Sequence, residues 1–166
     1  MYDNKVKEKR INGMKGYPKQ MLEMVNSRLG GLNIALGLKF TLVELDKLIA
    51  ELTVSDQHKQ PYGIVHGGVY SAMIETLCST GAALNVIGDG RTAVGMENAT
   101  SFLRAVRSGV LRCTAQPQFK GKRSHVWVAE VHDDRDRLVA TGRVRLIVLE
   151  PGAEADGTKV GIQISP

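Results

Sequence analysis

The chain has 166 residues, 43% of them hydrophobic and 23% charged, which is typical of one globular domain with a sizeable core. No apolar run approaches the roughly 20 residues that span a bilayer, and two cysteines build no disulfide framework, so we expect a cytoplasmic protein without membrane contact. The net charge of +5 is spread along the chain without a nucleic-acid-binding motif, and only 5% of residues are aromatic, so we expect no nucleic-acid partner.

The N-terminal 32 residues are expected to lie outside the main domain. Residues 1–16 are polar and glycine-punctuated, which is typical of an arm. Residues 18–29 place apolar side chains at helical spacing, and a glycine pair then ends this short helix. Residues 33–38 are predicted to form a connector or a short strand.

The sequence from there to residue 150 predicts two strands, a long helix and four further strands. Alternating apolar residues predict strands over residues 39–45 and 47–54. An apolar helix is expected from Gly68 to Val86, ending at the turn Gly88-Asp89-Gly90. Beyond it the hydrophobic pattern has a period of two, which predicts strands over residues 92–103, 109–119, 124–133 and 138–149.

Short polar breaks separate these last four strands, so we expect consecutive strands to pair as an antiparallel meander. One long apolar helix beside an antiparallel sheet predicts an α+β domain in which the sheet curls over the helix. We therefore divide the chain into an N-terminal arm with a short helix (1–32), the main domain (33–150) and an irregular tail (151–166).

The segment from Pro61 to Thr80 indicates a function most clearly. His66-Gly67-Gly68 ends a loop and opens directly into the apolar helix, where paired glycines let the backbone approach a ligand closely. The unpaired N–H groups and the dipole of a helix start favour negative charge. Glu75 follows after about two helical turns among small and apolar residues, where a carboxylate is costly to bury without partners. An oxyanion-type donor near a carboxylate indicates acyl chemistry.

This segment resembles the hotdog-fold acyl-CoA thioesterases, in particular the PaaI-like branch of the 4-hydroxybenzoyl-CoA thioesterase superfamily. The family pattern is a polar residue, a short loop, His-Gly-Gly, and an acidic residue eight positions after the first glycine. The resemblance extends from Leu38 to Leu149, since residues 98–104 resemble the family's strand before a charged turn and residues 109–148 its closing strands. It implies a hotdog fold, an antiparallel β-sheet wrapped around one long central α-helix. In this chain the pattern is carried by Gln60, His66, Gly67, Gly68 and Glu75.

The resemblance implies an enzyme that hydrolyses an acyl- or aryl-CoA to the free acid and CoA, without a metal or redox cofactor. The Gly67 N–H would polarise the thioester carbonyl, and Gln60 would help to bind that carbonyl or the attacking water. Glu75 would act as general base or as nucleophile, and both roles remain open. Ser79 lies beside Glu75 on the helix and would hold the water. Some relatives have a further serine on the next strand, where this chain has Gly95.

The other candidate residues concern binding of the substrate. We expect His66 to line the site and to shape the loop by hydrogen bonds, with Gly68 beside it, and not to act as a base. The remaining histidines lack the spacing of metal ligands, so no metal site is predicted. Basic side chains suit the phosphates of coenzyme A. The candidate phosphate ligands are Arg104, Lys120, Lys122 and Arg123.

The resemblance also implies an oligomer, because in this family the site forms across a dimer. Gly67 and Gln60 of one subunit would face Glu75 of the other, and two such homodimers would assemble into a homotetramer. Two alternatives stay open, a non-catalytic acyl-CoA-binding protein and a hydroxyacyl dehydratase on the same fold. A dehydratase requires a catalytic histidine well before the helix acid, whereas His66 adjoins the helix start. The sequence does not predict the acyl specificity.

Overall fold

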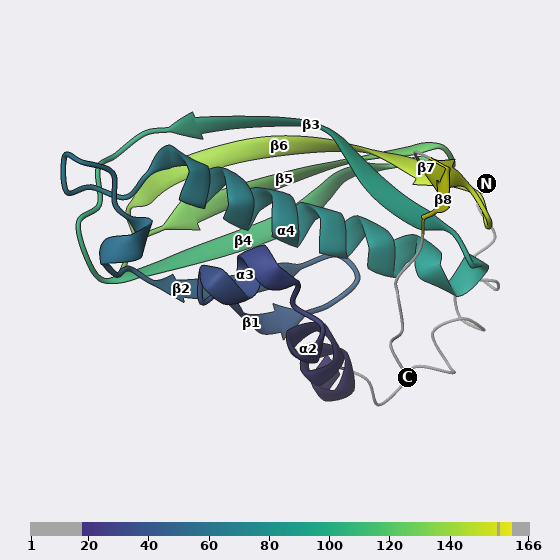
Figure 1. Cartoon of the computed structure of the whole chain (residues 1–166), viewed down its shortest axis with the longest axis horizontal. Helices are drawn as coiled ribbons and strands as arrows, with labels where there is room; N and C mark the ends of the chain where they lie inside the picture. Colours follow the sequence, from purple (N-terminus) through teal and green to yellow (C-terminus); the bar gives the residue numbers. More distant parts are fainter. Residues whose placement is uncertain (1–17, 156, 161–166) are drawn as a thin grey trace.

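The computed structural model describes residues 18–155 and 157–160, and the predicted arm over residues 1–16 lies outside them. One antiparallel sheet of six strands curls around a single long helix, α4 (Gly67–Val86), as Figure 1 shows. This arrangement confirms the predicted α+β hotdog architecture and the long central helix. The strands are β1 (Lys39–Val43), β2 (Leu48–Thr53), β3 (Thr92–Phe102), β4 (Val110–Lys120), β5 (Ser124–His132) and β6 (Leu138–Leu149).

The strand order is β1-β2-β4-β5-β6-β3, so the predicted simple meander is wrong at one connection. Strands β4, β5 and β6 do pair consecutively, but β3 pairs with β6 at the far edge of the sheet. The segment after β3 crosses the end of the sheet, where the Val65 N–H donates to the Val106 carbonyl at 2.8 Å. The Val54 N–H donates to the Gly109 carbonyl at 2.9 Å, which places β4 beside β2. A short break between two strands therefore predicts that they pair only where the chain reverses its direction between them.

Within residues 18–38, two short helices precede the sheet. The predicted first helix is confirmed as α2 (Pro18–Ser27). Residues 33–38, predicted as a connector or a short strand, form no strand, because α3 (Gly31–Ala35) includes the first three of them and a turn follows. The Asn33 and Ile34 N–H groups donate to the Gly30 carbonyl, which closes this helical turn. The tail contains a small hairpin, β7 (Glu154–Ala155) with β8 (Thr158–Lys159), where an irregular segment was predicted. Two 3₁₀ turns complete the order, η1 (Asp56–His58) and η2 (Ile87–Asp89).

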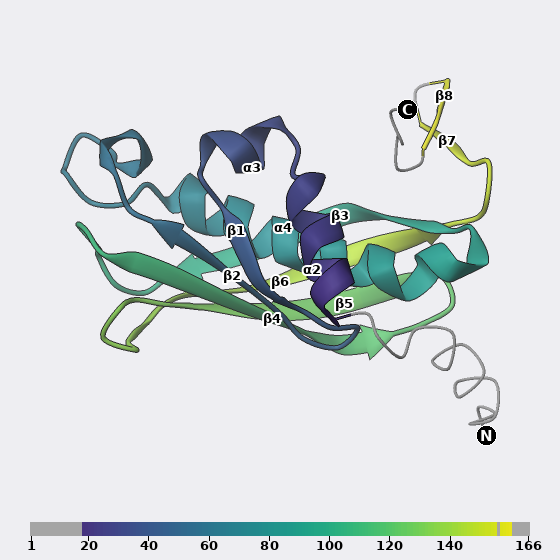
Figure 2. The same cartoon turned by 90° about the horizontal axis from the view of Figure 1, so that it is seen from below.

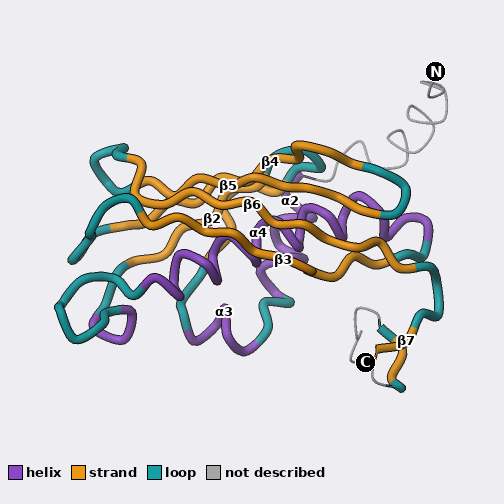
Figure 3. The backbone as a smooth tube through the Cα atoms, turned by 90° about the horizontal axis from the view of Figure 1, so that it is seen from above, coloured by secondary structure: helices purple, strands orange, loops and turns teal. Residues whose placement is uncertain are grey.

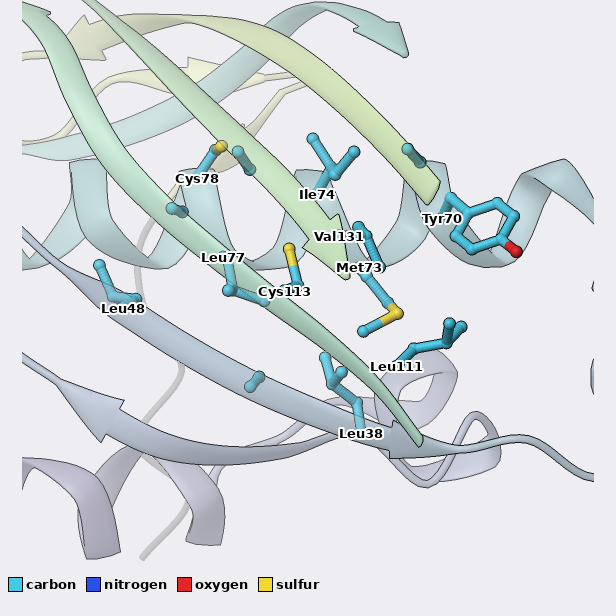
Figure 4. Packing of buried hydrophobic residues seen from close by; sticks show 14 of the residues in the cluster. Leu38, Leu48, Tyr70, Met73, Ile74, Leu77, Cys78, Leu111, Cys113 and Val131 are labelled. Atoms are coloured by element: carbon cyan, nitrogen blue, oxygen red, sulfur yellow. The ribbon is translucent and has the colours of Figure 1, made fainter. Parts of the chain in front are cut away.

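The core lies between α4 and the concave face of the sheet (Figures 3 and 4). Apolar side chains on one face of α4 are buried, among them Met73, Ile74 and Leu77, which repeat at helical spacing. Trp127 of β5 is fully buried and packs against α4 at Gly81, where an added Cβ would lie 2.5 Å from the indole ring. Among the described residues, no helix is both long and apolar enough to cross a membrane.

The two edges of the sheet differ in how they are covered (Figure 2). At β1 the Asn26 amide of α2 accepts from the Phe40 N–H and donates to the Phe40 carbonyl, both at 3.0 Å. This pair occupies the outward main-chain groups of Phe40, as a neighbouring strand would. Strand β3 has no such cover from the described part of the chain, and Met96 and Phe102 on it are more than half exposed. The open edge of the sheet is therefore β3.

The contact between α4 and Trp127 predicts a large effect of one methyl group. Gly81→Ala should lower the free energy of unfolding by about 1–3 kcal/mol, because the buried indole has no room to move away. Gly31→Ala is the matched control, since an added Cβ there meets nothing within 4 Å. Chemical denaturation measures both variants. Equal stability of the two variants would show that the helix and the indole are not packed this tightly.

Candidate active site

The start of α4 is fixed by His66, which is its N-cap residue. The His66 Nδ1 accepts a hydrogen bond from the Gly68 N–H at 2.9 Å, so the ring proton is assigned to Nε2. The ring therefore shapes the loop, as its predicted role requires, and one of its nitrogens is already in use. The same bond occupies the amide of Gly68. Gly68 therefore offers a ligand close backbone approach, but no free donor.

The neighbouring amide of Gly67 has a different environment. No hydrogen bond of the described residues uses the Gly67 N–H, and this amide lies in the first turn of a 20-residue helix. An added Cβ at Gly67 would lie 2.7 Å from the Phe102 ring of β3. The glycine is therefore required by the closeness of an aromatic ring, since Gly67 is not among the glycines with a positive φ. A free N–H at a helix start can donate to a carbonyl oxygen that becomes negative.

A pocket of about 480 Å³ opens at this amide. Gln60 and Arg104 are both among its walls, so two more of the predicted residues gather around Gly67. Tyr70 and Phe102 contribute an aromatic pair with ring centroids 6.0 Å apart. The lining comprises Gln60, Ile64, Val65, His66, Gly67, Gly68, Tyr70, Phe102, Leu103, Arg104 and Ala105.

The loop that carries Gln60 and His66 is anchored by a residue that the sequence did not single out for this purpose. His58 is 2% exposed, and its Nδ1 accepts from the Ser55 N–H at 2.9 Å while its Nε2 bonds the Leu36 carbonyl at 3.1 Å. The His58 carbonyl in turn accepts from the His66 N–H at 2.8 Å. The serine three positions before His58 resembles a capping pattern, which was the available signal. His58 therefore has a structural role.

A second cluster surrounds Glu75 in the middle of α4. The Ser79 hydroxyl donates to Oε1 of Glu75 at 2.8 Å, so the predicted pair on the helix is present. The Asn98 amide of β3 donates to Oε2 at 3.0 Å, a partner that the sequence analysis missed. Gly95 of β3 faces the same carboxylate, and an added Cβ there would collide with Oε1. The missing side chain at Gly95 thus makes room for Glu75 itself.

The structure does not bring Glu75 and Gly67 together within one subunit. They are eight positions apart on the same helix, which is about 12 Å along its axis. Glu75 is not among the residues that line the pocket at Gly67. The chain therefore carries two separate groups of candidate residues, a donor half at Gly67 and a carboxylate half at Glu75.

The basic turn between β4 and β5 lies at the other end of α4. The Lys120 ammonium donates to the Asp46 carboxylate and, at 3.1 Å, to the side-chain oxygen of Asn85, near the C-terminus of the helix. Asn85 is 18 positions after Gly67, or about 27 Å along the axis. Lys122 and Arg123 are exposed there, and no ion pair of the described residues involves them. Of the four predicted phosphate ligands, Arg104 alone lines the pocket at Gly67.

The described residues indicate neither a cysteine nucleophile nor a metal-binding cluster. Burial, with a smaller contribution from Glu75, raises the pKa of the Cys78 thiol far above its ordinary value, so this thiol stays protonated and is a poor nucleophile. No group of three or more His, Cys, Asp or Glu side chains in the described residues is arranged to hold a metal ion.

Comparison with known proteins identifies the family of the chain. The family model of the Thioesterase superfamily matches residues 62–140. The Mycobacterium tuberculosis protein Rv1847 is 45% identical over 117 residues, which are 69% of this chain and 84% of that protein. The 1,4-dihydroxy-2-naphthoyl-CoA hydrolase of Escherichia coli is 30% identical over 129 residues, 77% of this chain and 94% of the hydrolase.

Superposition on solved structures supports the same family through its fold. The structure of Rv1847 superposes with a TM-score of 0.70 at 42% identity and covers 72% of this chain and 96% of that one. The Haemophilus influenzae thioesterase HI1161 superposes with a TM-score of 0.73 at 30% identity and covers 77% and 90%. With one long helix inside a curled antiparallel sheet and these relatives, the chain belongs to the thioesterase superfamily and has its hotdog fold.

Proposed function

We propose that this protein hydrolyses acyl-CoA thioesters, with Glu75 and the Gly67 N–H acting on the same thioester group. The observation that carries the proposal is that the chain holds both an unused helix-start amide and a carboxylate that two neutral donors hold in place. The 1,4-dihydroxy-2-naphthoyl-CoA hydrolase among the relatives supports a coenzyme A thioester as the substrate class. The chemistry requires no metal or redox cofactor.

The reaction is addition to a carbonyl followed by loss of a thiolate. The Gly67 N–H and the helix dipole stabilise the negative charge that develops on the carbonyl oxygen. As general base, Glu75 takes a proton from water while the water oxygen bonds to the carbonyl carbon, and the proton passes to the departing sulfur as the C–S bond breaks. As nucleophile, Glu75 bonds to the carbonyl carbon itself, the C–S bond breaks and the CoA thiolate leaves and takes up a proton from solvent; water then hydrolyses the mixed anhydride to the free acid and the Glu75 carboxylate. Ser79 and Gln60 can hold the water or the carbonyl in either route.

The two half-sites meet if two subunits pair along β3. The edge at β1 is covered through Asn26, whereas β3 is open and exposes apolar side chains. Pairing β3 with its copy around a two-fold axis covers that edge and sets two α4 helices side by side. Such a homodimer places Glu75 of one subunit near Gly67 and Gln60 of the other. A further pairing of two dimers into a homotetramer rests on the family resemblance alone.

The basic turn at Lys122 and Arg123 is proposed to bind phosphates of the coenzyme A nucleotide. Both side chains are exposed and unpaired among the described residues, and both lie on the Glu75 side of α4, away from their own Gly67. We propose that a substrate whose thioester lies at Glu75 extends toward this turn. Lys120 has a mainly structural part in the turn, because Asp46 and Asn85 already bind it. Arg104 remains available at the pocket at the start of α4.

The dehydratase alternative is disfavoured by the hydrogen bonds of His66. Its Nδ1 caps the helix by accepting from the Gly68 N–H, so this nitrogen is not available as a catalytic base. Non-catalytic binding does not require two donors on one carboxylate, and a hydrolysis screen over aryl, short-chain and long-chain acyl-CoAs decides between binding and turnover.

Glu75→Gln should leave folding and acyl-CoA binding intact and reduce kcat by at least about a hundredfold, because the amide neither accepts the proton nor attacks the carbonyl. Glu23→Gln is the control, since Glu23 is exposed on α2 and distant from the site. Steady-state kinetics and calorimetric binding of the same acyl-CoA give the two readouts. Wild-type turnover by a folded Glu75→Gln enzyme removes Glu75 from the mechanism.

Replacing Lys122 and Arg123 together with alanine should raise KM for acyl-CoA with little change in kcat, because phosphate contacts bind the ground and transition states alike. Lys39→Ala removes an exposed cation from β1 and should change neither constant. A truncated thioester without the nucleotide should not distinguish the double variant from the wild type. An equal loss of rate with that truncated substrate would show that the turn does not bind the nucleotide.

A shared site predicts complementation between two inactive variants. Glu75→Ala lacks the carboxylate, and Gly67→Pro lacks the amide donor. Refolded together at random, half of the dimers carry one intact site of two, so about a quarter of wild-type activity should return. Gly67→Ala, which keeps the N–H but adds the same Cβ against Phe102, separates loss of the donor from crowding. Confirmed subunit exchange without recovered activity contradicts a shared site.

A further inference from the structure

Asn98 is the partner of Glu75 that comes from outside the helix. Its Nδ2 donates to Oε2 of Glu75 at 3.0 Å and to the Ser71 carbonyl at 3.1 Å. Ser79, from the helix itself, holds Oε1. Each carboxylate oxygen therefore has its own donor, on opposite sides of the group. Two such bonds restrict rotation of the carboxylate about its last side-chain bond, which otherwise turns freely.

Thr100 determines which end of the Asn98 amide faces the helix. The Thr100 hydroxyl lies 2.6 Å from Oδ1 of Asn98 and donates to it. With Oδ1 occupied, the NH₂ end is the one that faces Glu75, which resolves the oxygen and nitrogen of the amide from the hydrogen-bond network. A free amide could instead turn its oxygen toward the carboxylate, where the two oxygens repel.

A β-bulge brings Asn98 and Thr100 to this face of β3. Gly95 pairs with Leu146 and Glu97 with Arg145, so Met96 is an extra residue in the ladder. The extra residue changes the alternation of side chains, so that Gly95 before the bulge and Asn98 after it both face α4. Glu97 faces the other way, where Arg143 and Arg145 bind it at 3.4 and 3.5 Å.

We propose that Asn98 is a positioning residue for hydrolysis, which Thr100 orients and the bulge at Met96 brings against the helix to hold the Glu75 carboxylate in its working direction. This inference rests on the proposed function, in which Glu75 acts on the thioester. The Asn98 amide supplies a fixed hydrogen bond to a charged group, and the carboxylate does not have to find its orientation in each turnover. Asn98 acts through Glu75 and binds no part of the substrate.

The first test separates kcat from KM. Asn98→Ala should lower kcat roughly ten- to a hundredfold, the effect of losing one hydrogen bond to a charged group, and leave KM within about twofold. Thr100→Val should lower kcat by a smaller factor, and Thr100→Ser, which keeps the hydroxyl, should restore it. Equal kcat for the wild type, Asn98→Ala and Thr100→Val overturns the proposal.

Asn33→Ala is the matched control. The Asn33 side-chain oxygen accepts from the Thr76 hydroxyl at 2.8 Å, so this variant also removes an asparagine–threonine hydrogen bond at α4, but one position away from Glu75. Its kcat should equal that of the wild type. A similar loss of kcat in Asn33→Ala and Asn98→Ala would show that general loosening of the helix causes both effects, against a positioning role.

Two further readouts link the effect to Glu75. In the Glu75→Gln background, Asn98→Ala should lower kcat by less than about twofold, because the group that it positions is gone. A full additional loss contradicts the proposal. Crystal structures do not depend on activity: in Asn98→Ala the Glu75 carboxylate should leave its place beside Gly95, and an unmoved carboxylate overturns the proposal. Failure of the proposed function is distinct, since it appears as an inactive wild type.

Discussion

Burial of one face of α4 against the concave side of the sheet determines where Gly67 and Glu75 lie. The indole of Trp127 packs on Gly81, and the apolar face of the helix fills the rest of the curl. With that face fixed, the helix start and Glu75 keep a set direction relative to β3. The contacts of β3 with the helix then follow, Phe102 over Gly67 at one end and Asn98 on Glu75 further along. The chemistry therefore depends on the packing of a single helix.

The same helix separates the two groups that the proposed reaction brings to one carbonyl. A rigid helix cannot bring residues eight positions apart to the same atom, so the proposed reaction takes the donor at Gly67 and the carboxylate at Glu75 from different copies of the chain. The sheet offers a place for that second copy, because α2 covers the edge at β1 and leaves the edge at β3 open. In the proposed dimer, strand β3 is both the contact between the two copies and the support of the carboxylate.

The sequence predicted most of the fold and, within the candidate site, that Ser79 lies beside Glu75 on α4. Hydrophobic period and turn residues predicted α4 and all six strands, because one face of each element is buried. The place of β3 at the far edge was missed, since local breaks carry no information on a crossing connection. Asn98 was missed because strict alternation turns it away from the helix, and a bulge at Met96 leaves no mark in the pattern. The role of Gly95 was also not predicted, because the room that it leaves for the Glu75 carboxylate can be recognised only in the three-dimensional structure.

The most direct measurement is a crystal structure of the protein with an acyl-CoA analogue in which a CH₂ group replaces the thioester sulfur. The account predicts two chains joined along β3, with the analogue's carbonyl oxygen about 2.7–3.2 Å from the Gly67 nitrogen of one chain. The carboxylate of Glu75 from the other chain should lie against the carbonyl carbon, directly or through one water. An analogue held entirely by one chain, or a carbonyl oxygen away from Gly67, would contradict the account.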